Sequence, residues 1–295
     1  MKHLPARALL ALLWLLHGLP LPVLAALGRR LGAALHLLGR ARCAVARRNV
    51  ALCLPHLSAA QQQALVREHF AWLGRSLLER SLLWYASPAR LQRLIAVEGD
   101  VHLAERSQRP VMWLVPHFLA LDVAGVATQL FQRREVVSIY QAQSNAVFDA
   151  AMRSGRLRFG LAQVFARQET ALPLVRAIRR GKAFFNLPDM DFGPKDAAFV
   201  PFFGVSAATL LAPSRMARSL NMLVQPVVAH ILPGGQGWRV RFLEPWADWP
   251  SADAQADARR MNEWIESQIL QDPAQYLWVH RRFKTRPPGQ APLYD

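Results

Sequence analysis

The sequence predicts an α/β fold, in which a helical N-terminal segment precedes a mixed, largely parallel sheet flanked by helices. The 295 residues are enough to bury a substantial core. The first third of the chain carries helical periodicity and long apolar runs. From Pro110 onward, short apolar runs typical of strands alternate with helical stretches, an order that builds a parallel sheet.

The N-terminal segment is apolar and interrupted. Apolar stretches cover residues 8–16 and 19–27, with His17 and Gly18 between them and two prolines nearby. A spanning helix needs about 20 unbroken apolar residues, so the segment is marginal as a span. Four interpretations remain: a cleaved signal peptide with a site at Val23-Leu24-Ala25, one retained span, a kinked hairpin lying in one leaflet, or a buried helical hairpin.

The same segment is strongly basic. Nine Lys and Arg residues and no Asp or Glu precede Glu68. Arginines continue to Arg48, beyond the apolar part, which favours a retained anchor at an anionic, cytoplasmic lipid surface. We therefore assign residues 1–48 to a membrane-associating segment and residues 49–295 to the main domain.

The whole chain is basic as well, with a formal net charge of +16, and 32 of its 36 basic side chains are arginines. Such a surface predicts acidic partners. The basic residues are interleaved with Leu and Ala and form no recognisable nucleic-acid-binding motif, so a membrane surface fits better than nucleic acid. Two cysteines, Cys43 and Cys53, provide neither a disulfide framework nor zinc-site spacing.

Further elements follow from periodicity and turn chemistry. Ser58 begins a long helical pattern, and a second helical pattern near the C-terminus starts in the region of Asp253. The glycine-rich segment 233–237 predicts a hairpin between the last two strands. We expect strands at 111–115, 136–140, 183–187, 224–231 and 238–243, and helices at 120–130, 146–153, 171–180 and 208–219.

His117 directly follows the buried strand 111–115, and Asp122 lies five positions later, at the start of the next helix. Ligands and reacting groups of α/β proteins gather at strand ends. If His117 sits on the turn before the helix, the Asp122 carboxylate can hold one imidazole nitrogen and leave the other to take a proton from a hydroxyl. A His that caps the following helix is the alternative interpretation.

Two more groups of polar residues follow. Asp189 and Asp191 lie in a loop directly after the strand 183–187. The prolines and the glycine of this loop are typical of a well-made turn, and a divalent-cation site is the less favoured interpretation. Arg153, Arg156 and Arg158 could grip a phosphate or an oxyanion, or form a solvated basic face.

These residues resemble the lipid A biosynthesis acyltransferases of Gram-negative bacteria, the late acyltransferases within the lysophospholipid acyltransferase superfamily. The resemblance runs over nearly the whole chain and is most specific in the closing run 273–287. Other matching motifs are Arg48-Asn49-Val50, Cys53-Leu54-Pro55, the His117/Asp122 pair, Gly155-Arg156-Leu157-Arg158, Pro188-Asp189-Met190-Asp191-Phe192-Gly193 and Pro201-Phe202-Phe203. Met190 and the segment 209–212 depart from the family pattern, which leaves the acceptor and the acyl length open.

The resemblance implies an enzyme of the cytoplasmic face of the cell inner membrane that moves a fatty acyl chain from acyl carrier protein to a hydroxyl of a lipid A precursor. It implies His117 as general base with Asp122 as its orienting partner, and Arg156, Arg158, Asp189 and Asp191 as substrate-binding residues. A thioester is already activated, so no metal or redox cofactor is expected. The alternatives are a related acyltransferase acting on a phospholipid, an ornithine lipid or another glycolipid, and a non-catalytic membrane-surface binding protein.

Overall fold

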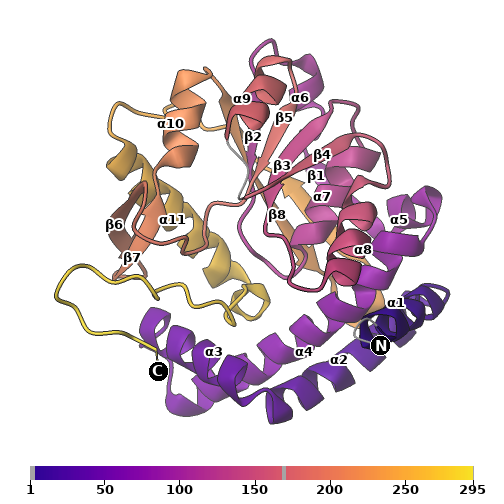
Figure 1. The fold of residues 1–295 in the computed structure, drawn as a ribbon. Coiled ribbons are helices and arrows are strands. Elements are labelled where there is room, and N and C mark those ends of the chain that lie inside the picture. The colour runs from indigo at the N-terminus through magenta and orange to yellow at the C-terminus, as the bar shows by residue number, and fades with distance from the viewer. Residues whose placement is uncertain (1–3, 168–170, 295) are drawn as a thin grey trace.

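A computed structural model describes residues 4–167 and 171–294, which are built around a seven-stranded sheet with the strand order β1-β9-β8-β2-β5-β3-β4 (Figure 1). Every neighbouring pair runs parallel except β8 and β9, which form the predicted antiparallel hairpin. A separate antiparallel hairpin, β6–β7, lies beside the sheet. The strands are β1 Ile95–Gly99, β2 Val111–Leu114, β3 Val136–Tyr140, β4 Ala162–Ala166, β5 Ala183–Asn186, β6 Ala197–Phe202, β7 Val205–Leu210, β8 Leu223–Ile231 and β9 Trp238–Phe242.

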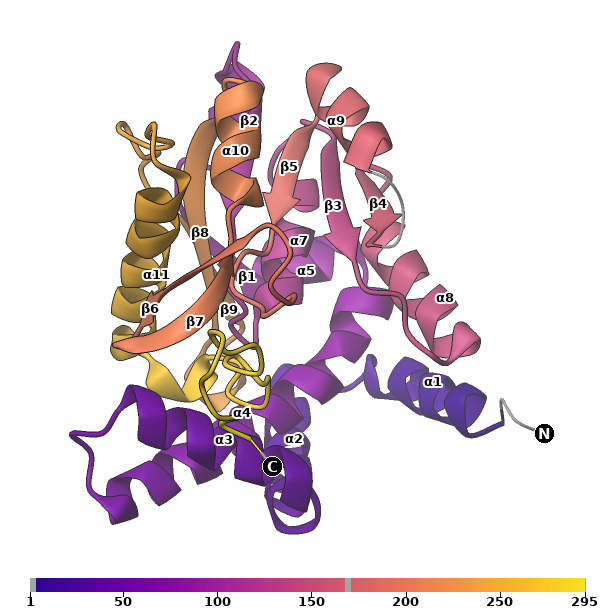
Figure 2. The same ribbon diagram turned by 60° about the vertical axis from the view of Figure 1, so that its left-hand side comes forward.

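Helices cover both faces of the sheet and form a base beneath it (Figure 2). Short 3₁₀ turns lie at Pro233–Gly235 and Pro273–Gln275. The α-helices are α1 Leu4–Leu16, α2 Leu21–Leu38, α3 Arg40–Cys53, α4 Ala59–Tyr85, α5 Pro88–Leu94, α6 Leu103–Arg106, α7 Leu121–Leu130, α8 Ala146–Leu157, α9 Ala171–Arg179, α10 Ala212–Ser219 and α11 Ala254–Gln271.

Strand β2 shows how the sequence builds the two layers of core. Its residues are all buried, and successive side chains point to opposite faces of the sheet. Trp113 packs into the cluster under α5, α7 and the end of α4, whereas Met112 and Leu114 pack into the cluster under α9, α10 and α11. A strand that is buried on both faces reads as the unbroken apolar run seen in the sequence.

Local sequence signals fix the ends of the long helices. Ser58 begins α4 with a capping box, in which its side chain accepts from the Gln61 amide while the Gln61 side chain accepts from the Ser58 amide. Asp253 caps α11 by accepting from the amides of Gln255 and Ala256. Both predicted helix starts are therefore confirmed.

One predicted helix is wrong in its first four residues. Residues 208–210 belong to strand β7 and pair with β6, so the helix expected at 208–219 begins only at Ala212. Phe203 and Gly204 both have positive φ, the backbone of a tight hairpin turn. A Phe-Gly turn lacks the usual Asn-Gly or Asp-Gly signal, and for that reason the hairpin was not predicted.

The N-terminal helix α2 packs closely against α4 because glycines lie at the contact. Helix α2 lies along α4 (Figure 1), and a Cβ at Gly32 would stand 2.0 Å from the Phe70 carbonyl oxygen. A Cβ at Gly74 would stand 2.1 Å from the Gly28 carbonyl oxygen. Backbones approach this closely only where side chains are absent. The predicted boundary between residues 48 and 49 falls inside α3, and the possible signal cleavage site lies inside α2.

Candidate active site

The sheet register brings His117 and Asp189 together. Leu114, the last residue of β2, pairs with Asn186, the last residue of β5. His117 and Asp189 each lie three residues beyond these partners, at the carboxyl edge of two neighbouring parallel strands. The His117 amide donates to Asp189 Oδ2 at 2.9 Å, and His117 Nδ1 lies 2.6 Å from Asp189 Oδ1.

The pair is electrostatically polarised. Asp189 is only 1% exposed, and this burial opposes its ionisation. The electrostatic interaction with His117, the two hydrogen bonds that His117 donates and the charge of Arg282 outweigh burial and hold the pKa of Asp189 below its ordinary value. In the neutral imidazole, an ionised Asp189 accepts a hydrogen bond from Nδ1–H, which leaves the lone pair of the ring on Nε2. His117 is thus arranged to accept a proton at Nε2.

Asp122 does not make the predicted contact with His117. Its Oδ2 lies 2.8 Å from Arg80 Nη2, and its Oδ1 accepts from Arg156 Nη2 at 2.9 Å. Burial opposes its ionisation, but Arg156 and Arg80 together lower the pKa of Asp122 to about 2. The reason is geometric. Asp122 lies in the first turn of α7, and its side chain points toward Arg80 of α4 and Arg156 of α8. Asp189 occupies the position beside Nδ1 of His117.

His117 and Asp122 nevertheless line the same large cavity, which has a volume of about 570 Å³. Helix α4 contributes one face of its surface to it, with Leu73, Ser76, Leu77 and Arg80 at i, i+3, i+4 and i+7. Most of the exposed lining is apolar. The charged side chains of the lining are Arg80, Asp122, Arg156, Arg167, Lys195 and Asp196, together with His117.

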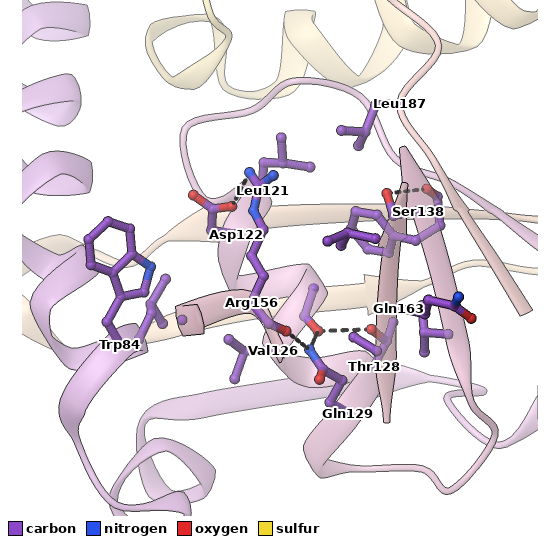
Figure 3. Close-up of a pocket in the computed structure, with 17 residues that line it drawn as sticks. Trp84, Leu121, Asp122, Val126, Thr128, Gln129, Ser138, Arg156, Gln163 and Leu187 are labelled. Carbon is purple, nitrogen blue, oxygen red and sulfur yellow. Dashed lines mark hydrogen bonds and ion pairs between the residues drawn. The ribbon is translucent and has the colours of Figure 1, made fainter. Parts of the chain in front are cut away.

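A smaller apolar cavity of about 60 Å³ continues inward from this site (Figure 3). Its walls come from α4, α7 and α8 and from strands β3, β4 and β5. The two cavities share five lining residues, namely Leu121, Asp122, Arg156, Phe185 and Leu187. The Asp122–Arg156 ion pair therefore stands where the large cavity meets the small one; Figure 3 shows the pair in the wall of the small cavity.

A second set of groups surrounds the His117–Asp189 pair from the C-terminal run. Burial and the neighbouring Asp189 carboxylate raise the pKa of the Tyr276 hydroxyl well above 10, so that group stays protonated. Arg282 is 2% exposed and donates to the Ala208 carbonyl and to Thr209 Oγ1. Burial, with the charges of His117 and Arg282, lowers the pKa of His280 to about 4, so it is neutral.

Two predicted substrate-binding residues lie away from the cavities. Asp191 is buried, and its carboxylate accepts from the amides of Gly193 and Thr285 and from the Thr285 hydroxyl. Arg158 donates to the carbonyls of Leu83 and Ala86 at the end of α4. Neither Asp191 nor Arg158 lines the large or the small cavity. Arg156 lines both cavities, and Asp189 lies directly behind His117.

Sequence reasoning missed Arg80, and it assigned no individual role to Lys195, Tyr276, His280 and Arg282, although the last three lie in the closing run 273–287. A signal was present for Arg80, since it falls on the same helical face as Leu73 and Leu77. His117 and Asp189 follow two adjacent strands at the same distance, so their contact could be predicted from the strand order. The strand order itself is a tertiary property that the local sequence does not reveal. Within residues 4–167 and 171–294, no three His, Cys, Asp or Glu side chains gather as a potential metal site.

Comparison with known proteins identifies the family. Residues 4–285 match the family described as bacterial lipid A biosynthesis acyltransferase. The lipid A biosynthesis palmitoleoyltransferase of Escherichia coli K12 is 33% identical over 97% of this chain and 92% of its own length. The lauroyltransferase of the same organism is 31% identical over 97% of this chain and 93% of its own. Its myristoyltransferase is 32% identical over 92% and 83%. A match of this extent over strands, cavities and C-terminal run alike places the chain in the bacterial lipid A biosynthesis acyltransferase family.

Proposed function

We propose that this protein transfers a fatty acyl group from the thioester of acyl carrier protein to a hydroxyl of a lipid A precursor, at the cytoplasmic face of the inner membrane. The observation that carries the proposal is the His117–Asp189 pair at the wall of a large, mostly apolar cavity. His117 is the general base and Asp189 is its positioning residue. In this proposal Asp189 replaces Asp122 as the orienting carboxylate, because Asp189 is the group within hydrogen-bond distance of Nδ1.

The reaction needs one proton acceptor and a fixed geometry. The acceptor hydroxyl oxygen attacks the thioester carbonyl carbon while His117 Nε2 takes the hydroxyl proton. The imidazolium formed is stabilised by the ionised Asp189. When the tetrahedral intermediate collapses, the C–S bond breaks and the leaving thiolate takes the proton back from Nε2. The products are the ester and the free thiol of the carrier.

The two cavities suit the two substrates. The exposed lining of the large cavity is mostly apolar and leaves room for an acyl chain. The small recess walled by Val126, Val136, Val164 and Phe185 would hold only the last carbons of that chain, where hydrocarbon replaces buried empty space. The arginine side chains of the large cavity suit a phosphorylated glycolipid, because guanidinium groups bind phosphate in bidentate fashion. Arg156 stands at the junction and is the substrate-binding residue that the cavities favour.

In this proposal the remaining residues position other groups and do not react themselves. Asp122 holds Arg80 and Arg156 in the wall of the large cavity. Asp191 fixes the loop that carries Asp189 to the C-terminal run through Thr285. Arg158 anchors the end of α8 to the end of α4. Acyl carrier protein and a phosphorylated lipid are both acidic, so the +16 charge of the chain attracts both.

The test is the lipid A mass spectrum of a strain that lacks this protein, followed by reconstitution. The strain should make lipid A without one ester-linked chain, and the purified enzyme should add that chain from an acyl carrier protein thioester in the presence of a chelator. Unchanged lipid A with altered phospholipid or ornithine-lipid acyl chains would assign the enzyme to one of those acceptors instead. Restoration that requires a divalent cation would contradict the metal-free step.

A further inference from the structure

We propose that α1 and α2 form a monotopic anchor: the hairpin enters only the lipid leaflet on the side of the catalytic domain, and neither helix crosses the bilayer. The inference rests on the membrane location in the proposed function and specifies its geometry. It decides between the interpretations of the N-terminal segment, because a spanning helix, a cleaved peptide and a leaflet hairpin require different packing of α2.

Helix α1 is apolar and largely exposed. Its described residues include one charged side chain, Arg7, and only Leu13 is buried. A helix that is apolar around its circumference is stable only inside a protein core or in lipid. Its 13 residues reach about 20 Å, whereas the hydrocarbon core of a bilayer measures about 30 Å. The large exposed side chains are Leu4, Leu9, Leu12, Trp14 and Leu15.

Helix α2 is long and apolar enough to cross a membrane by length and composition, but its packing opposes this. Gly28 and Gly32 lie in backbone contact with α4, where added Cβ atoms would approach Arg75 Cα to 2.6 Å and the Phe70 carbonyl oxygen to 2.0 Å. Leu24 on the same face is fully buried. Helix α4 carries the buried polar pair Arg75–Glu79, whose Nε and Oε1 atoms lie 2.6 Å apart, and cannot follow α2 into lipid. A crossing α2 would have to break this interface.

The turn between the two helices is also tied to the catalytic domain. Arg90 donates to the His17 and Leu19 carbonyls, at 2.5 Å each. On the other side, a Cβ at Gly235 would lie 2.5 Å from Pro22 Cα, so the β8–β9 connection presses against the start of α2. The turn therefore stays on the same side of the bilayer as residues 90 and 235. A hairpin that crosses the bilayer twice would place this turn on the far side, so that arrangement is excluded as well as the single span.

The charge of this surface indicates that α1 and α2 bind an anionic lipid leaflet. The exposed outer surfaces of α2 and α3 carry Arg30, Arg40 and Arg47, and no acidic residue precedes Glu68. Cations at this position bind anionic headgroups while α1 reaches the acyl region. Helix α1 contacts both α4 and α8, which contribute Leu77 and Met152 to the large cavity (Figure 2). Seated this way, the cavity lies beside the leaflet that supplies its lipid acceptor.

The topology is tested on the full chain carrying one cleavable tag at each terminus. Spheroplasts and inverted inner-membrane vesicles are treated with protease, and both tags should be cut only in inverted vesicles. A Gly18→Cys variant should stay unlabelled by a membrane-impermeant maleimide added to spheroplasts. Gly18 is exposed with only an ordinary contact at its Cβ position, and the two native cysteines are buried. An N-terminal tag cut in spheroplasts, or labelling of Gly18→Cys there, would overturn the proposal.

The anchor surface is tested with Leu12→Gln/Leu15→Gln on preformed vesicles of phosphatidylglycerol and phosphatidylethanolamine. Removing two inserted leucines should weaken partition by about tenfold or more. The matched control is Leu172→Gln on α9, an equally exposed leucine at the opposite end of the molecule (Figures 1 and 2), which should bind as the parent does. Unchanged partition with a shift in sedimentation would mean that a second copy covers α1, and the proposal would fall.

The topology and the proposed function can fail independently. Both tags on one side with no acyl transfer to any lipid A precursor would refute the function and keep the anchor. Normal transfer with the termini on opposite sides would do the reverse.

Discussion

Exchange of Asp189 for asparagine removes one negative charge from beside His117 and changes little in volume. In the structure Asp189 accepts from both the amide and Nδ1 of His117, and its ionised form is favoured. Asparagine can still accept one of these hydrogen bonds, but its NH₂ group can turn toward Nδ1. The imidazole then loses the partner that fixes its proton on Nδ1 and that stabilises the imidazolium formed during transfer.

The expected loss follows from the hydrogen bonds involved. A hydrogen bond to a charged group contributes about 1.5–3 kcal/mol, which corresponds to roughly 10- to 150-fold in rate. A misplaced tautomer adds to this, and the analogous exchange in serine proteases costs about 10⁴-fold. For Asp189→Asn we therefore expect a fall in kcat of on the order of 10² to 10⁴. The KM for the acyl donor should change little, since Asp189 contacts His117 and lines neither cavity.

The assay follows acyl transfer from the carrier thioester by mass spectrometry, with Asp122→Asn, His117→Ala and the double variant beside Asp189→Asn. His117→Ala should remove transfer, and adding Asp189→Asn to it should cost little more, because both changes disable one unit. Asp122→Asn should mainly raise KM, because it frees Arg80 and Arg156. If Asp189→Asn retains activity within about threefold of the parent while Asp122→Asn abolishes kcat, Asp122 is the orienting group and the reasoning is refuted.

Three further predictions concern the cavity, the α2–α4 contact and pH. Gly155→Ala should shift the enzyme's donor preference toward shorter acyl chains, because the new Cβ would lie 2.3 Å from the Trp84 ring and push that ring into the small cavity. The measurement is competition between acyl donors of different length, and an unchanged chain-length profile would contradict this prediction. Gly32→Val should lower stability by several kcal/mol in thermal unfolding, through overpacking against Phe70, whereas Gly18→Ala should change it little. Burial lowers the pKa of His69, His230 and His280 to about 4, so stability should be full above about pH 6.5 and fall as the pH drops toward 4, when the unfolded chain binds protons that the folded chain excludes. A flat melting profile between pH 7 and 4.5 would argue against neutral buried histidines.

The central strands and the long helices were predictable from sequence because local signals and burial agree there. Residues 111–114, 136–140 and 183–186 form strands within a residue of their expected ends. The edge strands β1 and β4 and the hairpin β6–β7 were not predicted. These strands are only partly buried, so their composition is mixed, and their pairing depends on contacts made by distant parts of the chain.

The candidate site was predicted in composition but not in pairing. His117 and Asp189 lie at neighbouring strand ends and Arg156 lines the same cavity as His117 from α8, yet the partner of His117 is the distant aspartate and not the one five residues away. A local spacing signal cannot compete with strand order, which places β5 beside β2 although 72 positions separate His117 from Asp189. Asp191 and Arg158 share motifs with neighbouring site residues, but their side chains point elsewhere.

The ties of the N-terminal hairpin to residues synthesised late impose an order on biogenesis. Pro22 contacts Gly235, and the Leu232 carbonyl accepts from Arg75, the residue that Gly28 touches. At about 5–20 residues per second, the more than 200 residues between Pro22 and Gly235 take roughly 10 to 40 s to synthesise. During that interval α2 can already pack on α4, but the start of α2 lacks its contact with the β8–β9 connection. The exposed apolar surface of α1 is therefore available to lipid before the catalytic domain is complete, and the last strands would close onto an N-terminus that is already at the membrane.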